Sequence, residues 1–185
     1  SNLLYDGAKV NLFTRPRRFG KTLNMSMLKH FFDIENGVEN RKLFENLKIS
    51  DSKYMTEQGK YPVIFISFKN LEEEDWKNCL RKIKNLIGDL YNEFEFLRKK
   101  LNKRDLKFFD SIWMEEEDVV WESALKNLTR YLYNYYGERK VIVLIDEYDT
   151  PIIQSYQEGY YKKAILFFKN FYGDALKDNS YLQYG

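Results

Sequence analysis

Gly20, Lys21 and Thr22 follow one another in the stretch FTRPRRFGKT, and side chains of these types can together bind a phosphate group. Glycine lets backbone N–H groups turn toward an anion, lysine reaches the terminal phosphates, and a threonine hydroxyl can hold Mg²⁺. The full pattern G-x-x-x-x-G-K-[ST] also requires an earlier glycine, and this chain has Arg15 there. The triplet alone leaves two interpretations open, a phosphate site or a chance run of three common residues.

A second set of reactive side chains ends the stretch VIVLIDEYD, residues 141–149. The apolar run predicts a strand with Asp146 at its tip, where a carboxylate can join the coordination shell of Mg²⁺. Glu147 follows and is placed to polarise a water molecule as a general base, which favours hydrolysis over phosphoryl transfer. The other interpretation is a strand ending in polar turn residues, and Asp149 with Thr150 and Pro151 predicts a turn.

Three arginines, Arg15, Arg17 and Arg18, add positive charge to the first stretch. They are either a solvated basic loop or cations around a triphosphate, because guanidinium groups match phosphate oxygens. Pro16 fixes its own φ and removes one backbone donor, so the loop has fewer N–H groups than the glycine form. We therefore expect weaker or slower nucleotide binding.

The elements that must position these residues follow from hydrophobic periodicity. Apolar or β-branched runs predict strands at 9–14, 61–68, 141–145 and 181–184. Helical spacing predicts longer helices, the first of which has Leu23, Met27, Leu28 and Phe31 as its apolar stripe. These helices span 22–32, 76–94, 104–113, 121–135 and 161–172, with a short one near 41–47. Two EEED runs, at 72–75 and 115–118, precede helices, where carboxylates favour the positive end of the helix dipole.

The alternation of strands and helices predicts one α/β domain over residues 1–185, with helices on both faces of a parallel sheet. Ligands of such sheets bind at the carboxyl ends of the strands. Both motifs fall at that edge, since Gly20–Thr22 follows the first strand and opens the first helix. Each motif is ambiguous alone, but their order and flanking elements together predict a P-loop fold.

Composition excludes several other classes of protein. Lys plus Arg is 30 and Asp plus Glu is 28, so the net charge of +2 predicts no global attraction to nucleic acid or membranes, although a local patch can still bind either. The single cysteine, Cys79, excludes an internal disulfide framework. No apolar run reaches the roughly 18 residues of a membrane span, and the start SNLLYDGAKV does not resemble a signal peptide. We expect a cytoplasmic protein.

The stretches NLFTRPRRFGKTLNMSMLKHFF, LFENLKI, GKYPVIFISFK and VIVLIDEYDTPI resemble the bacterial and archaeal AAA-ATPase-like proteins, over nearly the whole chain. These are predicted P-loop ATPases that often carry a C-terminal nuclease-like domain of the PD-(D/E)XK type. The form RPRRFGKT is usual in that family, so Arg15 is not a departure. The resemblance implies a three-layer α/β/α sandwich with a mainly parallel sheet, Mg²⁺ at Thr22 and Asp146, and Glu147 with Lys21 as catalytic residues. It also implies an ATP site made of Arg17, Arg18, Phe19, Gly20, Lys21 and Thr22.

The resemblance further implies a strand after SYLQYG that carries a polar sensor residue and lies between the two motif strands. On this interpretation the chain is cut before or within that central strand. Open sheet edges then predict a homo-oligomer or a marginally stable fragment with weak or absent turnover, and nucleic acid would be a partner through the missing domain. Two other functions remain open. One is a nucleotide-sensing module that controls an attached effector, and the other is a nucleic-acid-handling fragment.

Overall fold

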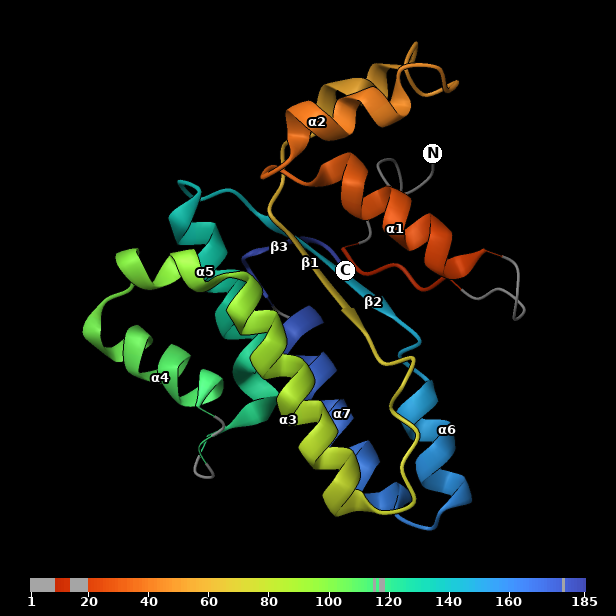
Figure 1. Ribbon diagram of the computed structural model, residues 1–185, viewed down its shortest axis with the longest axis vertical. Helices are drawn as coiled ribbons and strands as arrows, with labels where there is room; N and C mark the ends of the chain where they lie inside the picture. The colour runs from red at the N-terminus through yellow and green to blue at the C-terminus, as the bar shows by residue number, and fades with distance from the viewer. Residues whose placement is uncertain (1–8, 14–19, 115, 117–118, 178) are drawn as a thin grey trace.

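The computed structural model describes residues 9–13, 20–114, 116, 119–177 and 179–185. Its centre is a small parallel sheet in the order β1 (Val63–Ser67), β2 (Val141–Asp146) and β3 (Leu182–Tyr184). The register of β1 against β2 runs from Val63 opposite Ile142 to Ser67 opposite Asp146. Helices pack on both sides of these strands (Figure 1). The mixed α/β class expected from the sequence is confirmed at this coarse level.

The strands are apolar along their whole length because both faces of the sheet are covered. Ile64, Ile66 and Val143 belong to the larger hydrophobic cluster. Ile142 and Leu144 alternate with Val143 along β2, as Val63 does with Ile64 along β1, and these three residues belong to a second cluster on the opposite face. This alternation fixes the register, since a slip of one residue would exchange the two faces.

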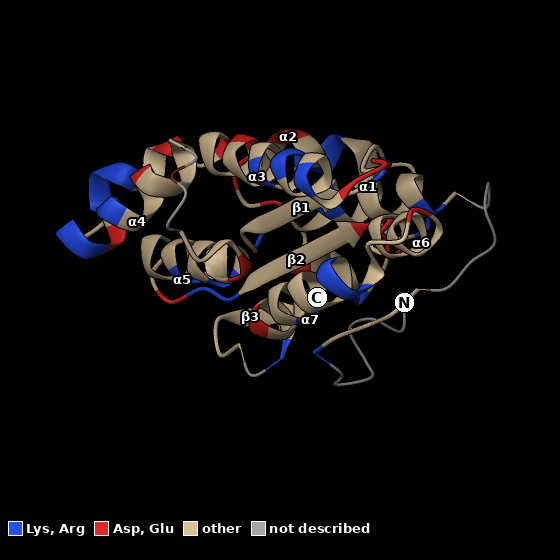
Figure 2. Cartoon of the chain, turned by 90° about the horizontal axis from the view of Figure 1, so that it is seen from below, with Lys and Arg blue, Asp and Glu red and all other residues tan. Residues whose placement is uncertain are grey.

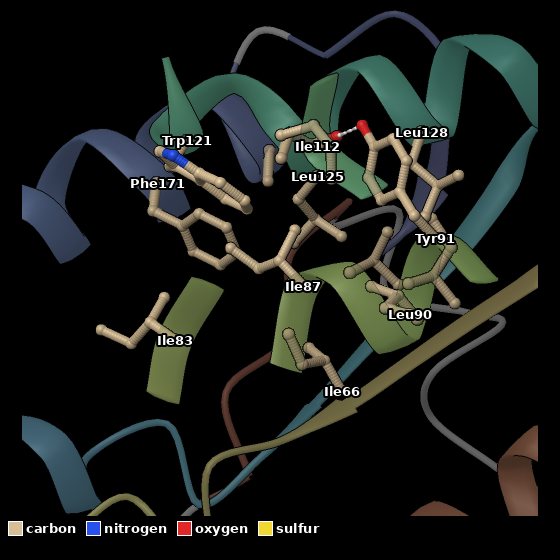
Figure 3. Packing of buried hydrophobic residues seen from close by; sticks show 14 of the residues in the cluster. Ile66, Ile83, Ile87, Leu90, Tyr91, Ile112, Trp121, Leu125, Leu128 and Phe171 are labelled. Atoms are coloured by element: carbon tan, nitrogen blue, oxygen red, sulfur yellow. Dashed lines mark hydrogen bonds between the residues drawn. The ribbon is translucent and has the colours of Figure 1, made fainter. Parts of the chain in front are cut away.

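The larger cluster packs α3 (Trp76–Glu93), α5 (Ala124–Tyr135) and α7 (Tyr161–Leu176) against one face, with α4 (Lys103–Trp113) packed on α3. Figure 3 shows its centre, where residues of α3 meet residues of α4, α5 and α7. The Tyr91 hydroxyl there donates to the carbonyl of Ala124 at 2.7 Å, so a buried polar group is satisfied. Asp75 caps α3 by accepting from the amide of Asn78 at 2.9 Å, which confirms the role expected for the first acidic run. Most of the second run lies outside the described residues.

The opposite face is covered by α1 (Lys21–Phe32), followed by α2 (Gly37–Arg41) and the 3₁₀ turns η1 (Lys42–Phe44) and η2 (Lys53–Glu57). The expected apolar stripe of α1 was wrong in part. Leu23 and Met27 are exposed, whereas the other two expected residues, Leu28 and Phe31, belong to the cluster on this face of the sheet together with Met25 and Phe32. Both sets have helical spacing, so periodicity alone does not choose between them.

The turn expected at Asp149, Thr150 and Pro151 is confirmed at Asp149, where the amide of Thr150 donates to the carbonyl of Glu147 at 3.1 Å. It was wrong for Thr150 and Pro151, which begin a helix, α6 (Thr150–Gln157). Proline fits the first turn of a helix, where its missing N–H would have no partner in any case. The helix follows directly after the acidic motif and leads into α7, the last helix.

The expected strand at 9–14 is not a named strand over its described part, residues 9–13, but it pairs with the end of the chain. The amide of Asn11 donates to the carbonyl of Gly185 at 2.7 Å, and the amide of Gly185 donates to the carbonyl of Lys9 at 2.8 Å. These are the hydrogen bonds of a parallel pair. β3 pairs with β2 through Leu182 and Tyr184, and the next residue, Gly185, pairs with residues 9–11. Residues 182–185 therefore lie between β2, which carries the acidic motif, and the segment that leads to the phosphate motif. The place that the resemblance assigned to a further strand is thus taken by SYLQYG itself.

Candidate active site

The two motifs meet at the carboxyl edge of the sheet. β2 ends at Asp146, which is only 3% exposed, and the neighbouring β1 ends opposite it at Ser67. The carbonyl of Asp146 accepts from the amide of Phe68 at 3.0 Å, so the strand holds its backbone in place. The buried carboxylate is therefore presented from a rigid position rather than from a mobile loop.

Thr22 lies in the first turn of α1 and reaches this carboxylate. Its Oγ1 donates to Oδ2 of Asp146 at 3.0 Å, across 124 residues of sequence. The contact is possible because Met25, Leu28 and Phe32 of α1 pack against β2 and its neighbours. The structure brings together the two side chains that the sequence assigned to a metal.

The N-terminus of α1 is open to an anion. Gly20 precedes the helix with φ of 70°, a left-handed conformation that favours glycine. No side chain caps this end in the described residues, and the first turn contains no acid. Backbone N–H groups without helical partners and the positive end of the helix dipole therefore point out of the helix beside Asp146. Lys21 is half-buried, and its amine has no ion pair within the described part of the chain.

Glu147 has a strained backbone. Its φ is 51°, in the left-handed region that costs a non-glycine residue about 1–2 kcal/mol. The turn is held from two directions. The amide of Thr150 donates to the carbonyl of Glu147 at 3.1 Å, with Oγ1 of Thr150 also 3.5 Å from Oε2 of Glu147. From the other side, the Tyr172 hydroxyl of α7 donates to the carbonyl of Tyr148 at 3.1 Å.

The Tyr172 ring is fixed by stacking on Phe168, with ring centroids 5.4 Å apart, and by an edge contact with Phe68. Burial raises the pKa of Tyr172 well above its usual value, and the nearby Asp149 acts in the same direction. The hydroxyl therefore keeps its proton and remains a donor. Sequence reasoning found neither Thr150 nor Tyr172. Pro151 in a helical first turn was the available signal for Thr150, and Tyr172 had none.

Some of the residues expected at the site lie within the described part of the chain, and others lie outside it. Gly20, Lys21 and Thr22 lie at the start of α1, and Asp146 and Glu147 follow one another at the end of β2. Arg15, Arg17, Arg18 and Phe19, which would complete the loop, lie outside the described residues.

Comparison with known proteins adds one finding to this geometry. The sequence model of the family described as Predicted AAA-ATPase matches residues 1–185. The chain belongs to this family. The resemblance drawn from the motifs is thereby confirmed for a predicted AAA-ATPase, whereas no curated protein and no solved structure matched the chain.

The two side chains that meet in this predicted AAA-ATPase, Thr22 and Asp146, carry oxygen atoms, the type of ligand that Mg²⁺ prefers. Mg²⁺ prefers oxygen ligands and usually takes one or two carboxylates together with substrate phosphates and water. The Thr22 hydroxyl and the Asp146 carboxylate are oxygen groups of this type, and they lie within hydrogen-bond distance of each other. The described residues contain no group of three or more His, Cys, Asp or Glu side chains that could hold a metal by themselves, so substrate phosphates would have to complete the shell.

None of the helices in the described part combines the length and apolar character needed to cross a membrane.

Proposed function

We propose that this chain is a P-loop ATPase core that binds ATP with Mg²⁺ and hydrolyses it. The observation that carries the proposal is the hydrogen bond from Thr22 to Asp146, which joins a phosphate-binding sequence to an acidic strand end. Each motif alone has an ordinary structural explanation. Their meeting at the carboxyl edge of a parallel sheet is the arrangement that nucleotide chemistry requires.

The layers of the fold support this proposal. Helices cover both faces of the sheet, as in a three-layer α/β/α sandwich. Residues 182–185 lie between β2 and the segment at Lys9 to Asn11 that leads toward the phosphate motif. A P-loop sandwich has this strand between its two motif strands, so the pairing supports the finer assignment.

The roles of the residues follow from their positions. Gly20 and the N–H groups at the start of α1 would surround the phosphates, with Arg17, Arg18 and Phe19 preceding them in the same loop. Lys21 would place its amine on the β- and γ-phosphate oxygens. Thr22 and Asp146 would hold Mg²⁺, which neutralises developing charge on the phosphates when it is bound.

Glu147 would orient the attacking water and accept its proton, as a carboxylate next to the metal site can do. The strained φ of Glu147 turns the chain out of the line of β2 directly after Asp146. The hydrogen bond from Tyr172 to the carbonyl of Tyr148 keeps that turn in place. Strain of this kind persists only where the surrounding structure determines it, and it is concentrated at functional sites.

Titration of the protein with Mg-ATP tests the binding step. We expect a dissociation constant in the micromolar range or weaker, because Pro16 removes one donor from the loop. Lys21→Ala should abolish binding, whereas Lys169→Ala, which removes the same charge from an exposed position of α7, should not change it. Unchanged binding by Lys21→Ala would refute the phosphate site.

Single-turnover hydrolysis tests the catalytic step. Glu147→Gln should keep Mg-ATP binding and lose most of the rate, since the amide cannot accept a proton. If Glu147→Gln hydrolyses ATP at the wild-type rate, the assignment of the base is wrong.

One observation favours a second function. Because Thr150 lies 3.5 Å from the Glu147 carboxylate, the base can be held away from water, and the chain would then sense nucleotide without turning it over. Such a nucleotide-sensing module would control an attached effector domain. It predicts that the wild-type protein binds Mg-ATP and leaves it intact in the single-turnover experiment.

A further inference from the structure

Residues 98–107, with the sequence RKKLNKRDLK, concentrate positive charge at one end of the molecule. They carry six cationic side chains and one carboxylate, a net charge of +5. Because the whole chain carries +2, all the other residues together carry −3. The segment covers the end of the 3₁₀ helix η3 (Glu95–Lys100) and the start of α4, and Figure 2 shows Lys and Arg gathered around α4.

Both acids within residues 98–110, Asp105 and Asp110, are already paired. Both carboxylate oxygens of Asp105 accept from Arg130 of α5, at 2.8 and 2.9 Å. Asp110 forms an ion pair with Arg98 at 3.0 Å. Five cations then remain on the surface, exposed and without an ion pair in the described part of the chain. These five define the basic surface: Lys99, Lys100, Lys103, Arg104 and Lys107.

Folding does not require cations at these positions of α4. Lys103 and Arg104 lie in its first turn, where the helix dipole disfavours positive charge by a few tenths of a kcal/mol to about 1 kcal/mol each. The side chain of Asn102 supplies the N-cap by accepting from the amides of Arg104 and Asp105, both at 3.0 Å. Asp105 is the acid of this turn, and acids in place of Lys103 and Arg104 would favour the helix further, so a role outside folding explains the two cations better.

The chemistry of the surface favours phosphate groups over a lipid bilayer. The apolar face of α4 is buried, with Phe109 and Ile112 at 1% and 0% exposure. The exposed apolar side chains here, Trp113 at 43% and Met114 at 62%, lie at the C-terminal end of α4. Arg98 lies over the Trp113 ring, so the two side chains do not form a continuous apolar stripe beside the five cations for insertion among acyl chains. A nucleic-acid duplex carries about one negative charge per 1.7 Å of its axis, so one cluster of cations faces several phosphates at once.

We propose that this basic surface binds the phosphate backbone of nucleic acids without reading their sequence. The surface lies on η3 and α4, elements that supply no residue of the nucleotide site, so binding does not depend on the proposed ATPase function. Backbone contacts of this kind release counterions, and the affinity then falls steeply with salt. The net charge of the whole chain does not reveal this surface, because the negative charge of the other residues offsets its positive charge.

The test is fluorescence anisotropy of the full chain with a short labelled DNA duplex of arbitrary sequence, without nucleotide. If about four phosphates are contacted, raising salt from about 50 to about 200 mM should weaken binding about 150-fold. The variant carries glutamine in place of Lys99, Lys103, Arg104 and Lys107. Lys100 is retained because its amine lies over the Tyr135 ring at 4.4 Å. This variant should lose nearly all of the salt dependence.

The matched control places glutamine at four exposed lysines of α7 and its C-terminal end, namely Lys162, Lys163, Lys169 and Lys177. It has the same net charge as the first variant and should bind the duplex like the wild-type protein. A smaller variant with only Lys99→Gln and Lys107→Gln removes one cation from each element. It should lose about half of the logarithmic salt slope, and it keeps the test decisive if the fourfold variant does not fold.

Three results would overturn the proposal. One is an equal loss of affinity in the α7 control, which would show a net-charge effect rather than a surface. Another is wild-type binding that does not change with salt. The third is tighter binding to anionic phosphatidylserine vesicles than to the duplex at equal phosphate concentration, which would assign the surface to membranes.

Discussion

Replacing Thr22 by valine removes one hydroxyl from the candidate site and leaves the shape of the side chain nearly unchanged. Hydrogen bonds to charged groups contribute about 1.5–3 kcal/mol. The distance of 3.0 Å to Asp146 is longer than the 2.5–2.7 Å of a strong hydroxyl–carboxylate bond, and Thr22 is exposed. We therefore expect Thr22→Val to lower the free energy of unfolding by about 1 kcal/mol, or the melting temperature by about 2–4 °C.

A double-mutant cycle measures this contact directly in the nucleotide-free protein. Urea unfolding of Thr22→Val, Asp146→Ala and the double variant should give a coupling energy of about 1 kcal/mol. Thr22→Ser keeps the hydroxyl and should remain close to wild type. A coupling energy within the roughly 0.3–0.5 kcal/mol scatter of independent sites would refute the contact, and with it the geometric basis of the metal site.

Three further predictions test other parts of the structure. The Arg130 guanidinium lowers the pKa of Asp105 in the folded state. The pair therefore stabilises the fold fully above the unfolded pKa near 4, and this stabilisation is lost as pH falls through the lower folded pKa. Asp105→Asn should make the free energy of unfolding, measured by urea titration, depend less on pH in acid. Tyr172→Phe removes only the hydroxyl that donates to Tyr148, and single-turnover hydrolysis should slow about fivefold without a change in Mg-ATP affinity. Glu147→Asn and Glu147→Gln should both stop hydrolysis, but only asparagine, which tolerates a left-handed backbone, should raise the melting temperature.

Outcomes that contradict these predictions are distinct. An unchanged acid profile in Asp105→Asn would show that the bidentate pair does not stabilise the native state. Weaker Mg-ATP binding by Tyr172→Phe, with no change in rate, would assign Tyr172 to binding rather than to positioning Glu147. Equal melting temperatures for the two Glu147 variants would mean that the backbone at this residue is not strained.

Much of the fold could be predicted because its signals are long or extreme. β2 is nearly all apolar, and the stripe from Trp76 to Leu90 runs through most of α3, so pattern alone locates both. The face of α1 could not be predicted, since Leu23 with Met27 and Leu28 with Phe32 are alternative helical stripes and tertiary packing chooses between them. The short helix α6 was missed because Thr150 and Pro151 suit a turn and a helix start equally well.

The candidate site also has one part that the sequence could predict and one part that it could not. Parallel strands end at one edge, so the meeting of Thr22 and Asp146 follows from topology and could be anticipated from the order of the motifs. The support of Glu147 could not be anticipated. Its contact with Thr150 depends on the start of α6, and the contact of Tyr172 with Tyr148 depends on how α7 packs against Phe68.

Glu147 is one of two non-glycine residues with positive φ in the described part of the chain, and the other, Glu138, shows what distinguishes them. Glu138 follows Gly137 at the end of α5, where its amide donates to the carbonyl of Tyr133 at 2.8 Å in an ordinary helix stop. Glu138→Asn should therefore stabilise the fold as Glu147→Asn does and leave hydrolysis unchanged. If both substitutions stabilise but only the one at Glu147 stops turnover, the strain after Asp146 serves the placement of a carboxylate rather than the fold. Equal loss of turnover in both variants would mean that strain relief alone disturbs the site.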